Sequence, residues 1–287
     1  MEAPEYSRAV AAARMTAASH HLPAEDAVVL HDSNKLTLRL RPCDVLARVA
    51  PVAHQNAQFE IDVARRLAQA GSPVAALDPR VEPHVHLRDG FAITLWTYYE
   101  PASSEEIAPA DFAQALEGLH AGLREVDVPA PHFTARVGEA QEIVADPGLS
   151  PDLPPAEREL LSTTLQRLRR TIGERSAPEQ LLHGEPHPGN LLATEAGPRF
   201  IDFETCCRGP VEFDLAHAPA AVAEYYPGID RGLLDDCRIL VLAMVTAWRW
   251  EVGDQLPHGR ERAAEWTAEI RAALARSARD AGRPHAG

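Results

Sequence analysis

The two halves of the chain space their hydrophobic residues with different periods. In the first hundred residues, runs with strand-like alternation lie at 27–42, 44–50 and 84–100. Turn-forming residues interrupt the first run at 32–34 and the last at Asp89 and Gly90, which predicts two β-hairpins. Apolar residues three or four positions apart at 58–71 predict one helix inserted between the strands.

Helical spacing dominates the rest of the chain. Helices are predicted there at 108–123, 154–172, 231–252 and 259–282, and one further helix is predicted before the strands, at 1–22. The pattern therefore predicts an α+β fold with two lobes. Residues 1–99 form an antiparallel sheet lobe with one inserted helix, and residues 100–287 form a larger, mainly helical lobe. Since ligand sites favour such junctions, we expect a cleft where the lobes join, near 96–100.

Composition and charge narrow the classes of partner. The formal net charge is −14, so a basic nucleic-acid-binding surface is not expected. An acidic surface suits solubility or a cationic small-molecule substrate. The longest apolar run, 239–248, is about half a membrane span, which predicts a buried helix and no membrane partner. The four cysteines show no C-x-x-C pair and no disulfide framework, which favours a reducing cytoplasm.

The stretch "LLHGEPHPGN", residues 181–190, concentrates polar chemistry where prolines and glycines prevent a regular helix or strand. Two short strands are predicted after it, at 191–194 and 199–203. Pairing Thr194 with Arg199 would bring Leu191 opposite Asp202 and place Asn190 diagonally beside Asp202. An amide oxygen and a carboxylate form a hard-oxygen pair that suits Mg²⁺ when phosphates supply further ligands.

"HGEPHPGN" followed by "IDFE" resembles the aminoglycoside phosphotransferase family, the small-molecule branch of the protein-kinase-like fold. The family pattern is His-Gly-Asp-x-x-x-x-Asn and then Ile-Asp with Phe or Trp. The residues that match it are His183, Gly184, Asn190, Ile201, Asp202 and Phe203, and Asp214 in "GPVEFDLA" resembles a second acid of the family. The resemblance implies transfer of phosphate from ATP or GTP, with Mg²⁺, to a hydroxyl of a small molecule. An aminoglycoside or another cationic antibiotic would be such a substrate.

The resemblance also implies roles for residues around the nucleotide. Asn190 and Asp202 would hold Mg²⁺, and Arg48 would stand where kinases place a phosphate-binding lysine. Glu60 would pair with Arg48 and fix its direction. The remaining nucleotide-binding candidates are Ser33 and Asn34 in the turn over the phosphates, and Trp96 and Tyr98 on the strand that faces adenine. Together these parts would position and neutralise a phosphoryl group.

The catalytic loop departs from the family pattern at one position. Its candidate residues are His183, Glu185 and Asn190, and Glu185 occupies the base position, where the family has Asp. His183 would brace the loop by hydrogen bonds. The extra methylene of Glu185 keeps a carboxylate but moves its oxygens, and a general base must lie within hydrogen-bond reach of its proton. Two hypotheses stay open: an active phosphotransferase, and a kinase-like pseudoenzyme that binds nucleotide or a small molecule without turnover.

The acceptor is expected on the helical lobe. Candidate residues for binding it are Glu212, Asp235, Asp236 and Trp248. A cluster of carboxylates would favour a polyamine, whereas a solvated acidic face is an equally good interpretation of any single one. Tryptophan can stack on a sugar ring or a cation. The protein is expected to be a monomer or a dimer.

Overall fold

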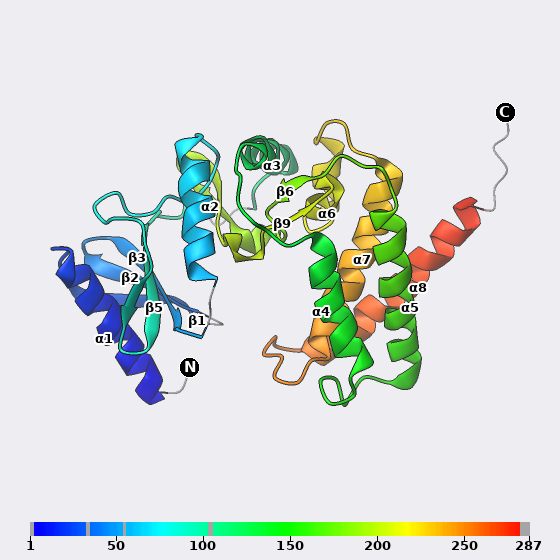
Figure 1. Cartoon of the computed structure of the whole chain (residues 1–287), viewed down its shortest axis with the longest axis horizontal. Coiled ribbons are helices and arrows are strands. Elements are labelled where there is room, and N and C mark those ends of the chain that lie inside the picture. The colour runs from blue at the N-terminus through cyan, green and yellow to red at the C-terminus, as the bar shows by residue number, and fades with distance from the viewer. Residues whose placement is uncertain (1–2, 33–34, 54–55, 103–105, 282–287) are drawn as a thin grey trace. The chain divides into compact units, whose positions relative to one another are not determined.

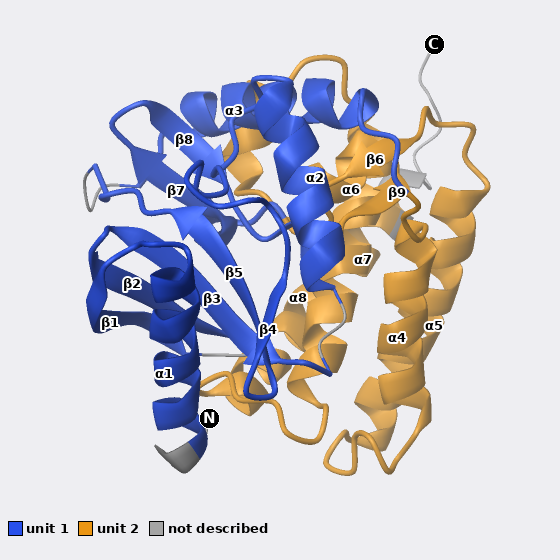
Figure 2. Ribbon diagram, turned by 60° about the vertical axis from the view of Figure 1, so that its left-hand side comes forward, with its two compact units in different colours: residues 1–128, 186–205 blue, residues 129–185, 206–287 orange. Residues whose placement is uncertain are grey.

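A computed structural model describes residues 3–32, 35–53, 56–102 and 106–281. The chain divides into two compact units (Figure 2). One comprises residues 1–128 and 186–205, and the other comprises residues 129–185 and 206–287. The first contains a five-stranded antiparallel sheet with α2 between its strands in sequence, and the second is mainly helical. The predicted α+β fold is confirmed. The predicted lobes, 1–99 for nucleotide and 100–287 for acceptor, remain a prediction about ligand binding.

The first unit is built on one antiparallel sheet. Its strands are β1 (Ala24–Asp32), β2 (Leu36–Pro42), β3 (Val45–Pro51), β4 (His86–Arg88) and β5 (Phe91–Thr97), in the order β1-β2-β3-β5-β4. Its helices are α1 (Ala3–Ser19), α2 (Ala57–Gln69) and α3 (Pro109–Arg124). Asp89 and Gly90, which join β4 to β5, both have positive φ, at 51° and 86°. A two-residue hairpin turn with this backbone matches the twist of its strands, so the predicted hairpin is confirmed.

Strand alternation gives this sheet two chemically different faces. Leu36, Leu38 and Leu40 of β2 are fully buried and share one core with small alanine side chains of α1. Figure 1 shows α1 beside the strands of this sheet. Residues between these leucines in sequence point to the other face. There Thr37 lies opposite Arg48, and Arg48 lies opposite Thr94 of β5. The strand pattern therefore places Arg48 on the face that is not filled by the core.

A segment from late in the sequence completes the first unit. It contains η1 (Pro188–Asn190), β7 (Leu191–Thr194), β8 (Gly197–Phe200) and η2 (Phe203–Thr205). The Phe200 N–H donates to the Pro73 carbonyl, and the Ala75 N–H donates to the Phe200 carbonyl, at 2.8 and 2.9 Å. The loop that holds these partners pairs with the sheet through Leu77 and Trp96. Backbone hydrogen bonds thus attach residues 186–205 to a sheet formed about a hundred residues earlier.

The β7–β8 hairpin corrects the predicted register. Thr194 pairs with Gly197 and not with Arg199, and Leu191 lies opposite Phe200 and not opposite Asp202. Gly197 has φ 97°, so it turns the chain within a two-residue loop where four residues were expected. The register differs by two residues, and an even shift leaves every side chain on its predicted face.

The second unit holds most of the helices. They are α4 (Phe133–Ala145), α5 (Pro155–Gly173), α6 (Val211–Leu215), α7 (Arg231–Arg249) and α8 (Gly259–Ala281), with the short elements β6 (Gln180–Leu182), β9 (Cys207–Gly209) and η3 (Ala220–Glu224). Its core contains the predicted apolar face of α7, including Leu240 and Met244. The sequence did not predict α4, whose glycine at position 138 weakens the helical signal. Among the helices of the described residues, none has both the length and the apolar character needed to cross a bilayer.

All four cysteines are reduced and buried, which agrees with the absence of a disulfide framework in the sequence. Burial raises the pKa of the Cys207 thiol, and the nearby Asp214 carboxylate raises it further. Burial also raises the pKa of Cys237. Both thiols are therefore protonated at neutral pH, and they pack as small apolar side chains.

Candidate active site

A pocket of about 650 Å³ lies within the first unit, on the sheet face opposite the α1 core. One wall is the exposed face of β2, β3 and β5, and another is formed by the returning segment of residues 186–205. The lining residues that the sequence analysis singled out are Arg48, Trp96, Tyr98, Asn190 and Asp202. The fold thus brings together candidates that lie more than a hundred residues apart in the chain.

Asn190 and Asp202 both line this pocket from the returning hairpin. The Ile201 N–H donates to the Asn190 carbonyl at 3.0 Å, so Asp202 follows directly after the residue opposite Asn190. Both side chains line the same pocket, although the register from which their proximity was predicted was wrong. Asp202 has φ 68°, a left-handed conformation that Asp and Asn tolerate better than most other residues. This turn ends β8 and aims the carboxylate into the pocket.

Arg48 connects the sheet to both neighbouring acids. Its Nη1 bonds Glu60 of α2, and its Nη2 donates to Asp202 Oδ1 at 2.9 Å. Glu60 is only 1% exposed, and Arg48 is one of the cations that compensate for burial of its carboxylate. Burial alone would lower the pKa of Arg48, but Glu60 and Asp202 raise it above its ordinary value, and the guanidinium stays charged. The predicted Arg48–Glu60 pair is confirmed.

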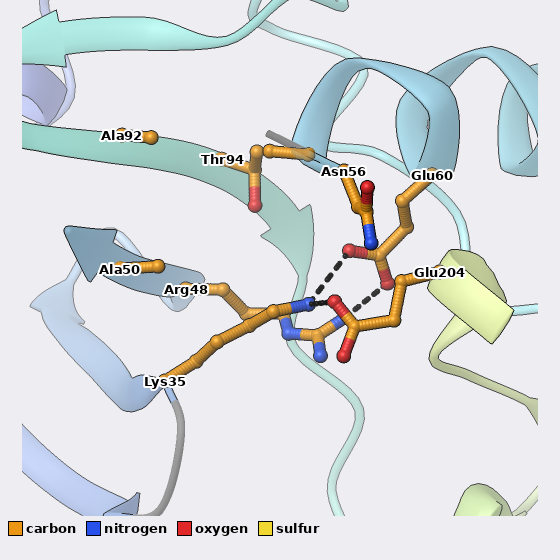
Figure 3. Close-up of a pocket in the computed structure, with 9 residues that line it drawn as sticks. Lys35, Arg48, Ala50, Asn56, Glu60, Ala92, Thr94 and Glu204 are labelled. Carbon is orange, nitrogen blue, oxygen red and sulfur yellow. Dashed lines mark hydrogen bonds and ion pairs between the residues drawn. The ribbon is translucent and has the colours of Figure 1, made fainter. Parts of the chain in front are cut away.

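Two further charged residues complete this cluster, and the sequence analysis missed both. Lys35, directly before β2, places Nζ 2.5 Å from Glu204 Oε2 and 3.3 Å from Glu60 Oε2. Figure 3 shows the Lys35 and Arg48 side chains converging on Glu60 and Glu204 from the sheet side. With Asp202, three carboxylates face two cations, so the cluster has an excess of one negative charge.

The acids of the cluster fit a divalent cation. Oxygens of Glu60, Asp202 and Glu204 all lie within 4.8 Å of one another. Asn190 lines the adjoining pocket and is nine-tenths buried. Carboxylate and amide oxygens are the ligands that Mg²⁺ prefers. The donor set therefore suits the predicted Asn190–Asp202 metal pair, with Glu204 as a further candidate ligand.

The other end of the pocket is aromatic. Trp96 is buried and donates from Nε1 to Thr94 Oγ1 at 2.8 Å, while Tyr98 and Tyr99 line the pocket at the end of β5. Flat aromatic side chains beside the end of a strand suit a purine base. Ser33 and Asn34, the other predicted nucleotide-binding residues, lie outside the described residues.

The loop with the predicted base belongs to the second unit. Asp214 is fully buried and accepts the backbone N–H groups of His183 and Gly184, each at 2.8 Å. His183 is also fully buried, and its Nδ1 accepts the Glu185 N–H at 3.3 Å. Both contacts agree with the predicted bracing role of His183. Glu185 is the last residue of the second unit before the chain returns to the first unit at Pro186, and Asn190 follows five residues later.

We expect Asp214→Asn to lower the free energy of unfolding by about 2–4 kcal/mol. The carboxylate accepts hydrogen bonds from two backbone N–H groups, and the side-chain NH₂ of asparagine would face one of these donors without being able to accept from it. Urea unfolding followed by circular dichroism measures this loss. Asp152→Asn, at a 71% exposed side chain, is the matched control and should stay within about 0.5 kcal/mol of wild type. A loss at Asp214 no larger than that of the control would show that the loop does not depend on this acid.

Arg136 of α4 is the partner of Glu185. Its Nη2 lies 3.2 Å from Glu185 Oε1, and its guanidinium lies 5.2 Å from the centre of the Trp248 ring. The Nε and Nη1 atoms of Arg136 are buried and have no hydrogen-bond partner among the described residues. The longer glutamate thus reaches a fixed cation, which holds its carboxylate in one place.

The predicted acceptor residues have separate partners within the second unit. Glu212 is buried and accepts the Asp230 N–H at 2.9 Å, at the start of α7. Asp236 pairs with Arg175 at 2.7 Å, and the exposed Asp235 pairs with Arg238 at 3.5 Å. Trp248 lies against Arg136. Each of these side chains thus has a partner within the protein, and binding of an acceptor by them stays a prediction.

Three functional candidates were thus missed, for different reasons. Lys35 is the only lysine of the chain, a compositional signal that could have identified it. Glu204 directly follows the matched "IDF" motif, so its position in the sequence was also informative. Arg136 lies in a helix that the pattern did not predict, and nothing in the sequence marked it.

Arg48 bonds both Glu60 and Asp202, and it lines one pocket with Asn190 and Asp202 against an antiparallel sheet. This arrangement is typical of a kinase-like phosphotransferase site. The sequence profile of the phosphotransferase enzyme family (APH) matches residues 28–238, which is well over half of the chain. The chain belongs to this family. No curated protein sequence matches the chain.

Solved structures share this fold at low sequence identity. Amicoumacin kinase hAmiN, in complex with AMP-PNP, Ca²⁺ and Ami, is 12% identical, with a TM-score of 0.70 over 93% of this chain and 95% of that chain. The GDP complex of aminoglycoside 2′-phosphotransferase-IIIa is 14% identical, with a TM-score of 0.68 over 94% and 99%. A choline/ethanolamine kinase family protein from Mesorhizobium loti is 18% identical, with a TM-score of 0.62 over 91% and 95%.

Proposed function

We propose that the protein transfers the terminal phosphoryl group of ATP or GTP, with Mg²⁺, to a hydroxyl group of a small molecule. The observation that carries this proposal is the pocket in which Arg48, held by Glu60, lies beside Asp202 and Asn190. Phosphoryl transfer needs mainly positioning and neutralisation of charge, which such a set of residues supplies. A magnesium ion held by Asn190, Asp202 and Glu204 would neutralise phosphate charge.

The nucleotide occupies the 650 Å³ pocket with its base beside Trp96 and Tyr98 and its phosphates toward Arg48. The acceptor oxygen attacks the terminal phosphorus, and the bond from that phosphorus to the bridging oxygen of the nucleoside diphosphate breaks. Glu185 takes the proton of the acceptor hydroxyl. Arg136 fixes the direction of Glu185 through its ion pair. The acceptor oxygen thus gains the phosphoryl group, Glu185 gains the proton and the nucleoside diphosphate leaves, so no further reactant is needed.

The acceptor is a small hydroxyl compound, and aminoglycosides and other cationic antibiotics belong to this class. The net charge of −14 supports a cationic acceptor through long-range attraction. Structural neighbours include an amicoumacin kinase, an aminoglycoside phosphotransferase and a choline/ethanolamine kinase family protein. Their names define the panel of acceptors to test, together with sugars.

One observation favours a second function, that of a nucleotide-binding protein without turnover. The carboxylate at the base position is a glutamate whose charge is neutralised by Arg136. The ion pair with Arg136 engages the carboxylate that would have to reach the acceptor hydroxyl. This hypothesis predicts nucleotide binding in the same pocket but no phosphorylated product.

Release of ADP or GDP, measured with Mg²⁺ and each acceptor of the panel, tests the proposed function. We expect one class of acceptor to raise nucleotide hydrolysis above the acceptor-free rate, with a product that mass spectrometry shows to carry one added phosphate. A protein that binds nucleotide but phosphorylates no acceptor supports the second function. A protein that binds neither ATP nor GTP contradicts both.

A further inference from the structure

We infer that Lys35 is the residue that binds the nucleotide phosphates with an ammonium group, a task for which the sequence pattern pointed to Arg48. The inference rests on the proposed function and assigns a residue of the same site. Four observations carry it: the composition of the chain, the position of Lys35 on the sheet, its contacts, and the engagement of Arg48.

The composition of the chain singles out this position. Lysine and arginine together number 28, and Lys35 is the only lysine among them. On a solvated surface either residue supplies a positive charge, whereas an ammonium on a flexible stem differs from a planar guanidinium where space and motion matter. The single lysine is not on the surface: Lys35 is only 9% exposed. The chain thus has its one ammonium side chain inside the candidate active site.

Strand geometry explains why Lys35 points into the site. Leu36 faces the α1 core, so its neighbours Lys35 and Thr37 face the other side. Lys35, Thr37 and Arg48 all line the 650 Å³ pocket. The positive charge of Lys35 is therefore directed at the same space as that of Arg48, from the adjacent strand.

Lys35 contacts all three acids of the cluster. Its Nζ lies 2.5 Å from Glu204, 3.3 Å from Glu60 and 3.6 Å from Asp202 (Figure 3 shows the first two contacts). These are the three acids whose oxygens could share a divalent cation. The ammonium thus neutralises the same oxygens that a metal would need. Asp202 and Glu204 would hold a divalent cation with the oxygens that now contact Nζ, and Lys35 would then be able to turn toward the phosphates.

Arg48 is less free to serve the phosphates. One of its terminal nitrogens bonds Glu60, and the other donates to Asp202. A guanidinium with both terminal nitrogens bonded links α2 to the returning segment of residues 186–205, and its position is fixed. Lys35 has four rotatable bonds and a point charge, so it can follow the phosphates when the acids exchange partners. In this site Arg48 therefore forms the ion pair with Glu60, and Lys35 contacts the phosphates, whereas a kinase uses one lysine for both.

The single lysine allows a direct test by NMR on the full-length protein. Protein grown with lysine labelled with ¹³C at the ε-carbon should give one side-chain signal. We expect this signal to shift when AMP-PNP and Mg²⁺ are added, and to stay in place with adenosine, which has no phosphates. Binding of AMP-PNP, monitored by the thermal midpoint, with an unmoved signal would overturn the inference and leave the proposed function intact. If AMP-PNP does not bind at all, both fail.

Substitution of Lys35 gives a second test, because the inference predicts weaker use of ATP but tighter binding of Mn²⁺. We expect Lys35→Met to lower kcat/KM for ATP by about 10- to 50-fold, since one charge-assisted contact to phosphate is lost. The same variant should bind Mn²⁺ without nucleotide several-fold more tightly, because the competing ammonium is gone. Lys35→Arg should recover only part of kcat/KM. Arg41→Met removes an exposed cation of the same strand and should match wild type in both assays. A purely structural role predicts weaker Mn²⁺ binding in Lys35→Met, and that result would contradict the inference.

Discussion

Replacing Asp202 by asparagine is expected to lower kcat by at least about 1,000-fold in any assay that detects turnover. The substitution removes the central negative charge from the predicted metal pair, and with it the neutralisation on which phosphoryl transfer depends. It keeps the size of the side chain. Asparagine also tolerates the left-handed backbone at this position, where φ is 68°. A loss of activity would therefore report the lost charge and not a rebuilt turn. Steady-state rates at saturating Mg²⁺ and nucleotide measure it.

The charge balance of the cluster predicts that this variant stays folded. Three carboxylates now face Lys35 and Arg48, and removal of the Asp202 charge leaves two of each sign. The free energy of unfolding should thus change little or rise, because the substitution removes repulsion between neighbouring carboxylates of a functional site. Asp152→Asn is the control for a surface aspartate and should keep wild-type kcat. If Asp202→Asn retains more than about a tenth of wild-type kcat, the metal pair proposed here is wrong.

Local patterns predicted the parts of the site that depend on alternation and on turns. Alternation predicted the strand that carries Arg48, and helical spacing predicted the helix that carries Glu60, whereas the family resemblance implied their roles. The hairpin that joins Asn190 to Asp202 was predicted with the wrong register, yet the two side chains still line one pocket. Both residues lie just outside the paired strands, Asn190 in η1 and Asp202 at a left-handed φ of 68°, so local turns and not strand alternation direct both side chains to this pocket.

The residues that sequence reasoning missed depend on tertiary contacts. Lys35 meets Glu204 across 169 positions of the chain, and no local period links a residue before β2 to a 3₁₀ turn after β8. Arg136 meets Glu185 only because α4 packs beside the base loop, and that helix gave too weak a signal to be predicted. Charge pairs of this kind follow from the packed fold, whereas motifs fix only the residues that they contain.

The second large effect is expected at Glu185. Glu185→Gln should lower kcat roughly 100- to 1,000-fold, because an amide cannot accept the proton of the acceptor hydroxyl. KM for the nucleotide should change less than about twofold, since the residues that line the nucleotide pocket are others. The amide oxygen can still accept from Arg136, so the loop keeps its anchor. Initial rates with varied nucleotide and a saturating acceptor separate the two parameters.

Glu179→Gln is the matched control, at an exposed glutamate six positions earlier that pairs with His132, and it should keep wild-type kcat. If Glu185→Gln also keeps wild-type kcat, Glu185 is not the base. If both kcat and nucleotide KM worsen together, the substitution has disturbed the site as a whole, and the proposed division of roles is wrong.

Glu185→Asp distinguishes a tuned base from an impaired one. Aspartate restores the usual acid of the family but withdraws the carboxylate by one methylene from Arg136, whose Nη2 now lies 3.2 Å away. If Arg136 fixes the base in its working position, we expect kcat to fall about 10-fold or more, since a displacement of about 1 Å can cost up to 100-fold. Arg136→Gln should then lower kcat in wild type but not further in Glu185→Asp, because the pair is already broken. A rise in kcat for Glu185→Asp would instead show that glutamate impairs this enzyme, and would favour the hypothesis of a binding protein derived from a kinase.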